Sequence, residues 1–388
     1  MPNTYTTTTT QGFGSRIMNS FAGLLIGPIL VIAAIGLLWW NEGRAVEAIV
    51  GLNEASSQVA EVQANNVSRA NEGKLIHVVA PASASSPIQD SDVGLTFNGQ
   101  VAVARTAEMY QWHEKSESHS TDNTGGSQTT TTTYTYEREW SEEPIDSSGF
   151  KYPDGHENPA MPFRSARYVA SDAKLGAYPL DSDTADRIDL SQALRPQAPD
   201  GWTQNGDYFY KGNASAPAIG EMRVRYASLP AGATVSVLAA QSSGGFAPFV
   251  TSNGYRIDMA ATGNQPASVM IENQRHTEAV MTWVLRAVGA VVMFLGFTMF
   301  LSPLSTMASV LPFLGSIVRG AAAGISIVIT VPLTLIVIAL AWLFYRPLIG
   351  GGLLLVAAGA IYGLWKWHHG RTAHPADAAA AAPTPAKV

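Results

Sequence analysis

Four apolar stretches, uncharged except for Arg286 in the second, separate the parts of the chain that suit lipid from the parts that suit water. The first, residues 21–40, is 20 residues long, and a helix of that length spans about 30 Å, the thickness of a bilayer's hydrocarbon core. The others follow residue 278 and are separated by Pro303, Pro312 and the Arg346-Pro347 pair, because proline interrupts a helix. The pattern predicts transmembrane helices at 21–40, 279–301, 320–345 and 347–365, with 302–319 as an interfacial or short cytoplasmic connection.

Basic residues beside the apolar stretches predict the orientation. With four spans both chain ends share one face, and the positive-inside rule makes that face cytoplasmic. Arg346 is the exception; the bases that support the rule are Arg16, Arg319, Lys366, Arg371 and Lys387. Residues 1–20, with their threonine run, and the Ala/Pro tail 366–388 are predicted to be disordered cytoplasmic ends. Residues 41–278 are then expected on the opposite face.

Between the first and second spans the pattern changes from helical to alternating. Residues 42–65 have apolar positions at helical spacing and predict an amphipathic helix after the first span. Short segments rich in Val, Tyr, Thr and Phe then predict strands at 75–79, 93–106, 107–112, 131–140, 166–170, 208–211, 222–226, 234–239 and 246–259. The fold class is thus an integral membrane protein with four transmembrane α-helices and a large β-rich (α+β) extramembrane domain of antiparallel sheets. Residues 116–133 are predicted to be the mobile tip of a long hairpin.

Charge and composition exclude several functions. The 388 residues include no cysteine, which removes disulfides, thiolate metal sites and a cysteine nucleophile. Residues 41–280 hold 29 acidic and 17 basic side chains, a net charge of −12. A nucleic-acid partner requires a basic surface, so none is predicted.

Enzyme motifs are missing from the sequence: it has no Walker loop, no GxSxG elbow, no HExxH pair and no nucleotide-binding glycine fingerprint. Candidate chemical sites include a metal group of His113, Glu114, Glu117 and His119, with Asp122 nearby, and a carboxylate group of Glu139, Glu142 and Glu143. Solvated strand ends explain both groups better, since preorganised ligands are rare beside a flexible loop. No catalytic residue, cofactor or metal is predicted.

Other residues are candidates for contacts. Glycines four residues apart let helices approach closely in lipid, and the candidate helix-contact or oligomerisation residues are Gly23, Gly27, Gly320 and Gly324. The candidate intramembrane polar residues are Arg286, Ser326, Thr330 and Thr334. The alternative interpretation is that the three hydroxyls bond to carbonyls of their own helix and that Arg286 snorkels to the outer interface. The candidate partner face is the aromatic set Tyr110, Trp112, Tyr134, Tyr136 and Trp140, for which core or cross-strand packing is the favoured interpretation and an exposed partner face the second.

A short repeat occurs at Asn41-Glu42-Gly43-Arg44 and Asn71-Glu72-Gly73-Lys74. Each copy is predicted to form a turn in which the glycine takes a positive φ and the glutamate pairs with the base after it.

In these segments the chain resembles the LUMA family, also called transmembrane protein 43. The resemblance covers residues 12–365, and its most specific motif is Ala341-Trp342-Leu343-Phe344-Tyr345-Arg346-Pro347-Leu348. Further matching segments are the two repeat copies and residues 108–112, 139–140, 155–159, 206–210 and 282–287.

The resemblance implies a four-span protein with cytosolic termini and a domain in the lumen of the ER or nuclear envelope. Eukaryotic members are described as self-associating scaffolds that interact with lamins and emerin, and a channel-like role has also been proposed. The family has no established catalytic residues to carry over. The Ala-rich, Lys-poor, Cys-free composition is typical of a bacterial member, which has no lamins and whose domain lies in the periplasm.

Together these features predict a non-enzymatic, self-associating membrane scaffold that organises a membrane patch or partner complex through its acidic domain. Its predicted partners are copies of itself, membrane lipids and unidentified proteins, and its predicted location is the bacterial inner membrane. An ion channel or conductance regulator is the alternative, and an ectoenzyme the third hypothesis.

Overall fold

The computed structural model describes residues 3–190 and 192–347, and in it three long helices run together. They are α1 (Phe13–Gln58), α3 (Ala267–Phe300) and α5 (Pro312–Tyr345), and among the described residues these three are long and apolar enough to cross a membrane. The amphipathic helix predicted after the first span is the second half of α1, which continues without a break as far as Gln58. The predicted fourth span and the 366–388 tail lie outside the described residues.

The connection between the second and third spans is helical. The short helix α4 (Ser302–Ala308) follows α3, and α5 begins at Pro312 rather than near residue 320. Both prolines sit in the first turn of a helix, where the missing N–H costs nothing and the fixed φ favours the helix. The apolar run is therefore interrupted after Phe300, as predicted, and the two prolines start the helices that follow.

The strands form two large sheets and two small hairpins. The first sheet has the order β1-β7-β6-β14-β13-β12, with β11 added to β14 and β8 to β6. Its strands are β1 (Thr4–Gln11), β6 (Gln100–Asp122), β7 (Gln128–Ser141), β8 (Ala166–Val169), β11 (Gln192–Leu194), β12 (Thr203–Asn205), β13 (Tyr208–Lys211) and β14 (Met222–Pro230). All its pairs are antiparallel, as predicted.

The second sheet has the order β10-β9-β3-β15-β16, with β19 added to β15 and β2 to β3, the last pair being parallel. Its strands are β2 (Ala60–Val62), β3 (Leu75–Ser83), β9 (Lys174–Leu175), β10 (Tyr178–Pro179), β15 (Thr234–Ser242), β16 (Gly245–Ala247) and β19 (Met259–Thr262). The hairpins are β4 (Ile88–Asp90) with β5 (Leu95–Phe97) and β17 (Phe249–Val250) with β18 (Arg256–Ile257). Three short helices complete the domain: η1 (Arg69–Asn71), η2 (Ser147–Gly149) and α2 (Ser182–Asp186).

The domain core lies between the sheets and includes Ile76, Val103, Phe209 and Val237. One ion pair is buried within it, where Arg105 contacts Asp90, and the hydroxyl of Tyr226 donates to the same carboxylate at 2.8 Å. Burial and the neighbouring carboxylate raise the pKa of Tyr226, so its hydroxyl stays a donor.

A three-stranded ribbon extends far from this core. We call the ribbon β1, β7 and residues 110–122 of β6; each residue from Thr4 to Gln11 pairs with one from Thr135 to Gln128. This corrects two predictions, because the threonine run is a strand rather than a disordered end, and residues 116–133 are mostly paired rather than a mobile tip. The physical reason is the β-branched side chain of threonine, which favours strands. Cross-strand hydroxyl bonds such as Ser118 to Thr132 at 2.9 Å add to the pairing.

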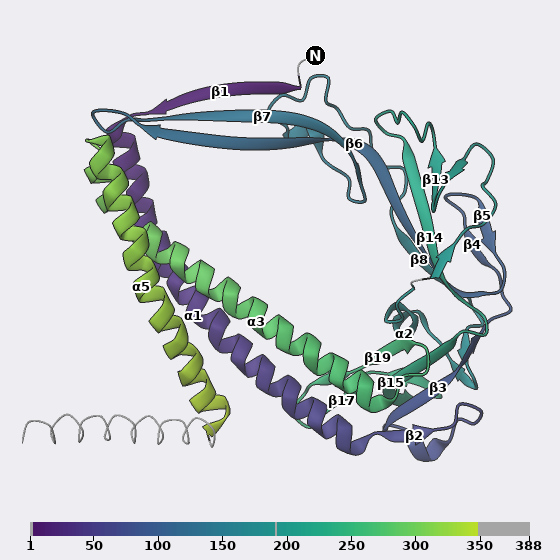
Figure 1. Cartoon of the computed structure of the whole chain (residues 1–388). Helices are drawn as coiled ribbons and strands as arrows, with labels where there is room; N and C mark the ends of the chain where they lie inside the picture. The colour runs from purple at the N-terminus through teal and green to yellow at the C-terminus, as the bar shows by residue number, and fades with distance from the viewer. Residues whose placement is uncertain (1–2, 191, 348–388) are drawn as a thin grey trace, which may run out of the picture.

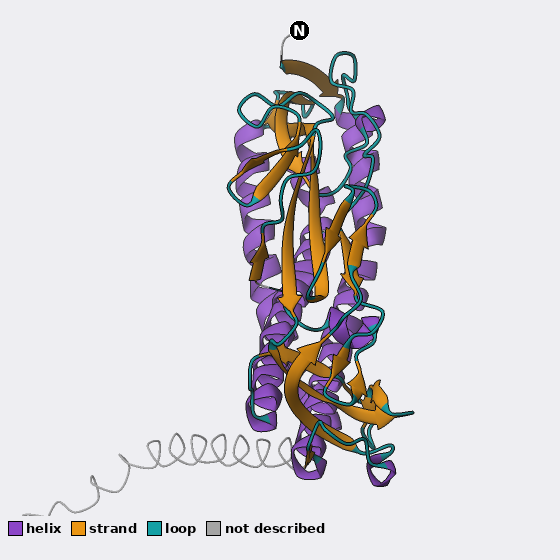
Figure 2. Ribbon diagram, turned by 90° about the vertical axis from the view of Figure 1, so that its right-hand side faces the viewer, coloured by secondary structure: helices purple, strands orange, loops and turns teal. Residues whose placement is uncertain are grey.

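The described residues are arranged as a closed frame (Figure 1). In that view the ribbon crosses the top, α1 and α3 run diagonally side by side, and the two sheets close the right-hand side. The domain therefore meets α1 at both ends, through β2 after Gln58 and through the ribbon tip near Phe13. The frame is narrow in the perpendicular view, where the strands stand in front of the helices (Figure 2).

Candidate functional site: polar clusters at both ends of the membrane helices

A buried ion pair joins the three long helices near the base of the domain. Glu42 on α1 accepts hydrogen bonds from Arg286 Nε at 2.7 Å and Nη2 at 2.8 Å, and from Trp342 Nε1 at 2.7 Å. The Glu42 side chain is 2% exposed and that of Arg286 is 14% exposed. We call these three residues the interfacial cluster. Because Arg286 has this partner, it is neither an isolated intramembrane charge nor a purely snorkelling one.

Aromatic rings and a second ion pair surround the interfacial cluster. The Arg286 guanidinium lies 4.7 Å from the ring centre of Trp283 and 5.9 Å from that of Trp342. Farther from the apolar stretch, Arg44 pairs with Glu278, whose Oε1 also accepts from the Tyr255 hydroxyl at 3.0 Å. The carboxylates of this region are thus fully engaged by protein donors.

The prediction for the repeat is wrong for its first copy and partly right for its second. Residues 41–44 lie inside α1, and Glu42 pairs with Arg286 on another helix rather than with Arg44. In the second copy Gly73 has the expected φ of +75°, but Glu72 accepts from Gln241 and from the backbone N–H of Ser243 instead of pairing with Lys74. The same four-residue pattern therefore serves a helix contact once and a turn once.

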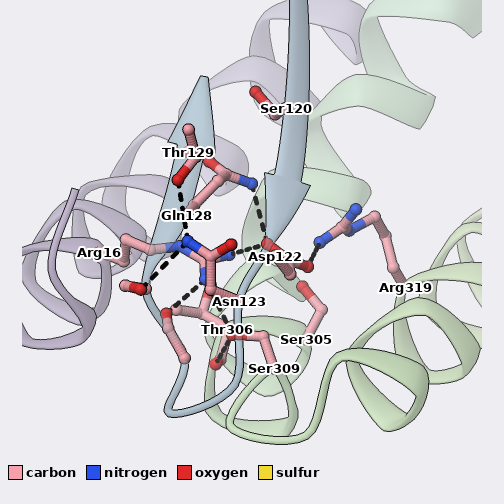
Figure 3. Close-up of polar contacts among 12 residues, drawn as sticks. Arg16, Ser120, Asp122, Asn123, Gln128, Thr129, Ser305, Thr306, Ser309 and Arg319 are labelled. Atoms are coloured by element: carbon pink, nitrogen blue, oxygen red, sulfur yellow. Dashed lines mark hydrogen bonds and ion pairs between the residues drawn. The ribbon is translucent and has the colours of Figure 1, made fainter. Parts of the chain in front are cut away.

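The second cluster is at the opposite end of the helices, where the ribbon tip contacts them (Figure 3). Asp122 lies between two arginines, with Arg16 Nη2 at 2.9 Å and Arg319 Nη2 at 2.6 Å. Arg16 Nη1 also donates to the Gly126 carbonyl at 2.5 Å and to the Ser309 hydroxyl at 3.1 Å. The side chains of Arg16 and Asp122 are 8% and 9% exposed. We call Arg16, Asp122 and Arg319 the tip cluster.

The two clusters bound an apolar belt. From Arg16 to Glu42 the helix rises by about 39 Å at 1.5 Å per residue, comparable to a bilayer with its interfaces. Within the belt α1 and α3 are in close contact: a Cβ atom on Gly23 would lie 2.6 Å from the Met299 carbonyl oxygen, and one on Gly27 2.5 Å from that of Gly296. Gly320 and Gly324 have nothing within 4 Å of the corresponding position among the described residues, so no contact with α1, α3 or α4 is made there.

The predicted intramembrane hydroxyls face the helix interface. Ser326 donates to the Ala322 carbonyl in its own helix at 2.8 Å, and Thr334 contacts the sulfur of Met293 on α3 at 3.7 Å. Thr330 is buried between them, and its Oγ1 has no hydrogen-bond partner among the described residues. All three side chains are buried in the single chain.

The aromatic set packs mainly against its own domain. Tyr136 is buried and stacks on His156 at 4.0 Å between ring centres, and burial together with the hydrogen bond to Glu114 raises the pKa of Tyr136 to about 12. Trp140 packs on Tyr110 at 5.2 Å. Trp112 and Tyr134 are half-buried against rings of the 150–156 loop, so core packing accounts for most of this set.

The residues weighed as chemical sites are dispersed. His113 pairs with Glu139 across the hairpin at 3.0 Å, whereas Glu117 and His119 lie exposed farther along β6 and Glu142 accepts from Ser165. Among the residues the structure describes, no three His, Asp or Glu side chains gather as metal ligands.

Sequence reasoning missed the partners that complete both clusters. Asp122 and Arg319 are far apart in sequence, and the strand character of residues 4–11 that brings the tip to α1 was not recognised. The importance of Glu42 and Trp342 could have been inferred from the sequence, because both belong to segments that carry the family resemblance.

Comparison with known proteins gives consistent results. A family model described as Transmembrane protein 43 matches residues 109–347. Curated relatives include "Transmembrane protein 43" of Homo sapiens, 29% identical over 360 residues, covering 88% of this chain and 89% of the relative. The protein of the same name from Pongo abelii is 30% identical over 356 residues, covering 87% and 88%. The "Transmembrane protein 43 homolog" of Drosophila melanogaster is 28% identical over 345 residues, covering 86% and 92%. No solved structure matches.

Proposed function

Because the chain belongs to the transmembrane protein 43 family, we propose that it is a non-enzymatic membrane scaffold that self-associates and holds its acidic domain against the bilayer. The observation that carries this proposal is the ribbon, a polar sheet that reaches from the domain to the far end of the apolar belt. A ribbon in that position constrains how lipid surrounds the molecule.

The apolar belt requires lipid on part of its surface. Its side chains are widely exposed in the single chain, for example Leu25 at 72% and Val328 at 71%. Burying such side chains in an apolar environment is worth about 1.5–3 kcal/mol each, so the helices need lipid or other chains around them.

The ribbon has the opposite requirement. Residues 110–122 extend about 40 Å at 3.3 Å per residue, which matches the length of the belt. About half of the ribbon's side chains are Ser or Thr. Its two edges are β1 and residues 110–122 of β6, and neither has a further neighbouring strand among the described residues. Unpaired backbone groups cannot face hydrocarbon, so at this depth the ribbon has to face water or another chain.

Self-association meets both requirements. Copies arranged with their helices outward expose the apolar belts to lipid, while the ribbons face inward. The edge strand β1 of one copy can then pair with residues 110–122 of β6 in the next copy. Because β1 and β6 are both antiparallel to β7, they run in the same direction, and the new pair is parallel.

The test is the mass of the full chain in lipid nanodiscs. Charged lysines block pairing at strand edges, so Thr8→Lys on β1 is expected to reduce defined multimers to smaller species. Thr203→Lys, on the exposed edge strand β12 at the far end of the same sheet, is the matched control and leaves the mass unchanged. A wild-type chain that is monomeric at every protein-to-lipid ratio refutes the proposal.

Conductance is the second candidate function, now supported by the ribbon rather than by α5. Inward ribbons lined with hydroxyls suit a water-filled passage. Purified multimers in planar bilayers are expected to conduct, and Thr131→Lys to shift their selectivity towards anions. Multimers of full size that pass no current reject this function.

For location we propose an integral membrane protein with the tip cluster towards the cytoplasm. The positive-inside argument rests on Arg16 and Arg319 at that end, and the base of the acidic domain then faces the periplasm of a bacterium, or the lumen of the ER and nuclear envelope in a eukaryote. Unidentified protein partners would bind this acidic domain.

A further inference from the structure

A pocket of about 190 Å³ opens beside the interfacial cluster, where α1, α3 and the end of α5 meet. Its wall has an apolar part, formed by Ala45, Ile49 and Leu52, and a charged part. Three arginines and two glutamates line the charged part: Arg275, Arg286, Arg346, Glu42 and Glu278. The lining thus combines an apolar wall with a net charge of +1.

The two carboxylates of the pocket are already satisfied. Glu42 is engaged on both oxygens by Arg286 and Trp342, and Glu278 is engaged by Arg44 and Tyr255. Glu42 therefore neutralises Arg286 of the lining, and Glu278 pairs with Arg44, which lies outside the pocket. Of the other two lining arginines, Arg275 has only a long, partly exposed contact with Glu272 at 3.8 Å and donates from Nη2 to Asn53 at 2.7 Å, and Arg346 has no ion pair to a described residue.

Free donors remain on all three lining arginines. Arg275 Nε is buried with no hydrogen-bond partner among the described residues. Arg286 uses Nε and Nη2 for Glu42, and Arg346 contacts the ring of Trp342 at 5.8 Å without an ion pair to any described residue. A buried N–H without an acceptor is costly, so the site is built for an anion.

We propose that this pocket binds a phosphate ester, and that its source is the headgroup of an anionic phospholipid. Guanidinium groups bind phosphate oxygens through charge-assisted hydrogen bonds. Trp283, 68% exposed at the end of the apolar belt, marks the level at which indole rings sit among headgroups. The net positive charge of the lining disfavours headgroups that carry their own cation.

The experiment measures lipid retention by the full chain with native mass spectrometry. Protein in mild detergent receives equal amounts of phosphatidylglycerol and phosphatidylcholine, and separate samples receive sn-glycerol 3-phosphate or inorganic phosphate as competitors. We expect at least about tenfold preferential retention of phosphatidylglycerol. Arg346→Gln and Arg275→Gln should each weaken it about tenfold or more, the loss typical of one charge-assisted hydrogen bond.

Arg69→Gln, at an exposed position outside the pocket, is the matched control and should retain lipid like the wild type. Unchanged tryptophan emission shows that each variant is folded. Equal retention of the two lipids, or pocket variants that bind like the control, overturns the proposal. Displacement of the lipid by inorganic phosphate or glycerol phosphate at equal concentration overturns the lipid assignment in favour of a free-phosphate site. None of these outcomes depends on subunit number, so the result is separable from the scaffold proposal.

Discussion

Replacing Glu42 by glutamine tests whether the interfacial cluster holds the membrane helices together. The substitution keeps the side-chain shape but removes the negative charge that accepts two hydrogen bonds from Arg286 and one from Trp342. Arg286, only 14% exposed, is left at the edge of the apolar belt without a counter-ion.

The magnitude follows from burial. Removing one partner of a buried ion pair costs about 3–5 kcal/mol, because the other charge stays desolvated and unpaired. Arg286 retains its contacts with two tryptophan rings and some exposure, so we expect the lower end, about 3 kcal/mol. Removing both charges with Glu42→Gln and Arg286→Leu should cost clearly less than the sum of the two single changes.

The assay is equilibrium unfolding of the full chain in mixed micelles, followed by tryptophan fluorescence. Glu47→Gln, an exposed position on the same helix, is the matched control and should stay within about 0.5 kcal/mol of the wild type. A Glu42→Gln variant within about 1 kcal/mol of the wild type, or single changes that simply add, would refute the assigned role.

Three further substitutions have definite expected outcomes. Gly27→Leu should destabilise the helix pair by about 1–3 kcal/mol or more through overpacking against α3. Gly320→Leu, with nothing within 4 Å among the described residues, should leave thermal unfolding unchanged; equal effects would contradict the assigned α1–α3 contact. Asp122→Asn removes the carboxylate shared by two arginines and should speed protease cleavage at the ribbon tip, and an unchanged rate would show that the tip is held by other contacts. Hydrogen bonds from the backbone N–H groups of Ser86 and Ser85 lower the pKa of Asp172, so its stabilisation is present above the carboxylate's unfolded pKa and is lost as pH falls towards the lower folded value. Asp172→Asn should therefore reduce the loss of unfolding free energy at acid pH. A variant with the same pH dependence of the unfolding free energy as the wild type would show that Asp172 makes no such contribution.

The sequence predicted the three long helices that the structure describes and most strands, because apolar runs and period-two alternation are local signals. It did not predict the frame. The threonines of residues 4–11 look disordered by composition, and only the edge of β7, more than 115 residues away, supplies their backbone partners. Such long-range pairing leaves little trace in a single sequence.

The polar clusters show the same limit. Arg286 was recognised as unusual inside an apolar stretch, but its partner Glu42 was assigned to a local turn with Arg44. The helix continues through Glu42 and turns its side chain towards α3. In contrast, Gly23 and Gly27 could be read from their spacing, since close packing of helices requires small residues at one face.

Particle images of the full chain in lipid nanodiscs test the central claim most directly, because they show at once where the ribbons and the helices lie. The scaffold account predicts closed rings in which the helices form the lipid-facing perimeter and neighbouring ribbons meet on the inside. Single chains surrounded by lipid on every side, with the ribbon unpaired, would contradict it.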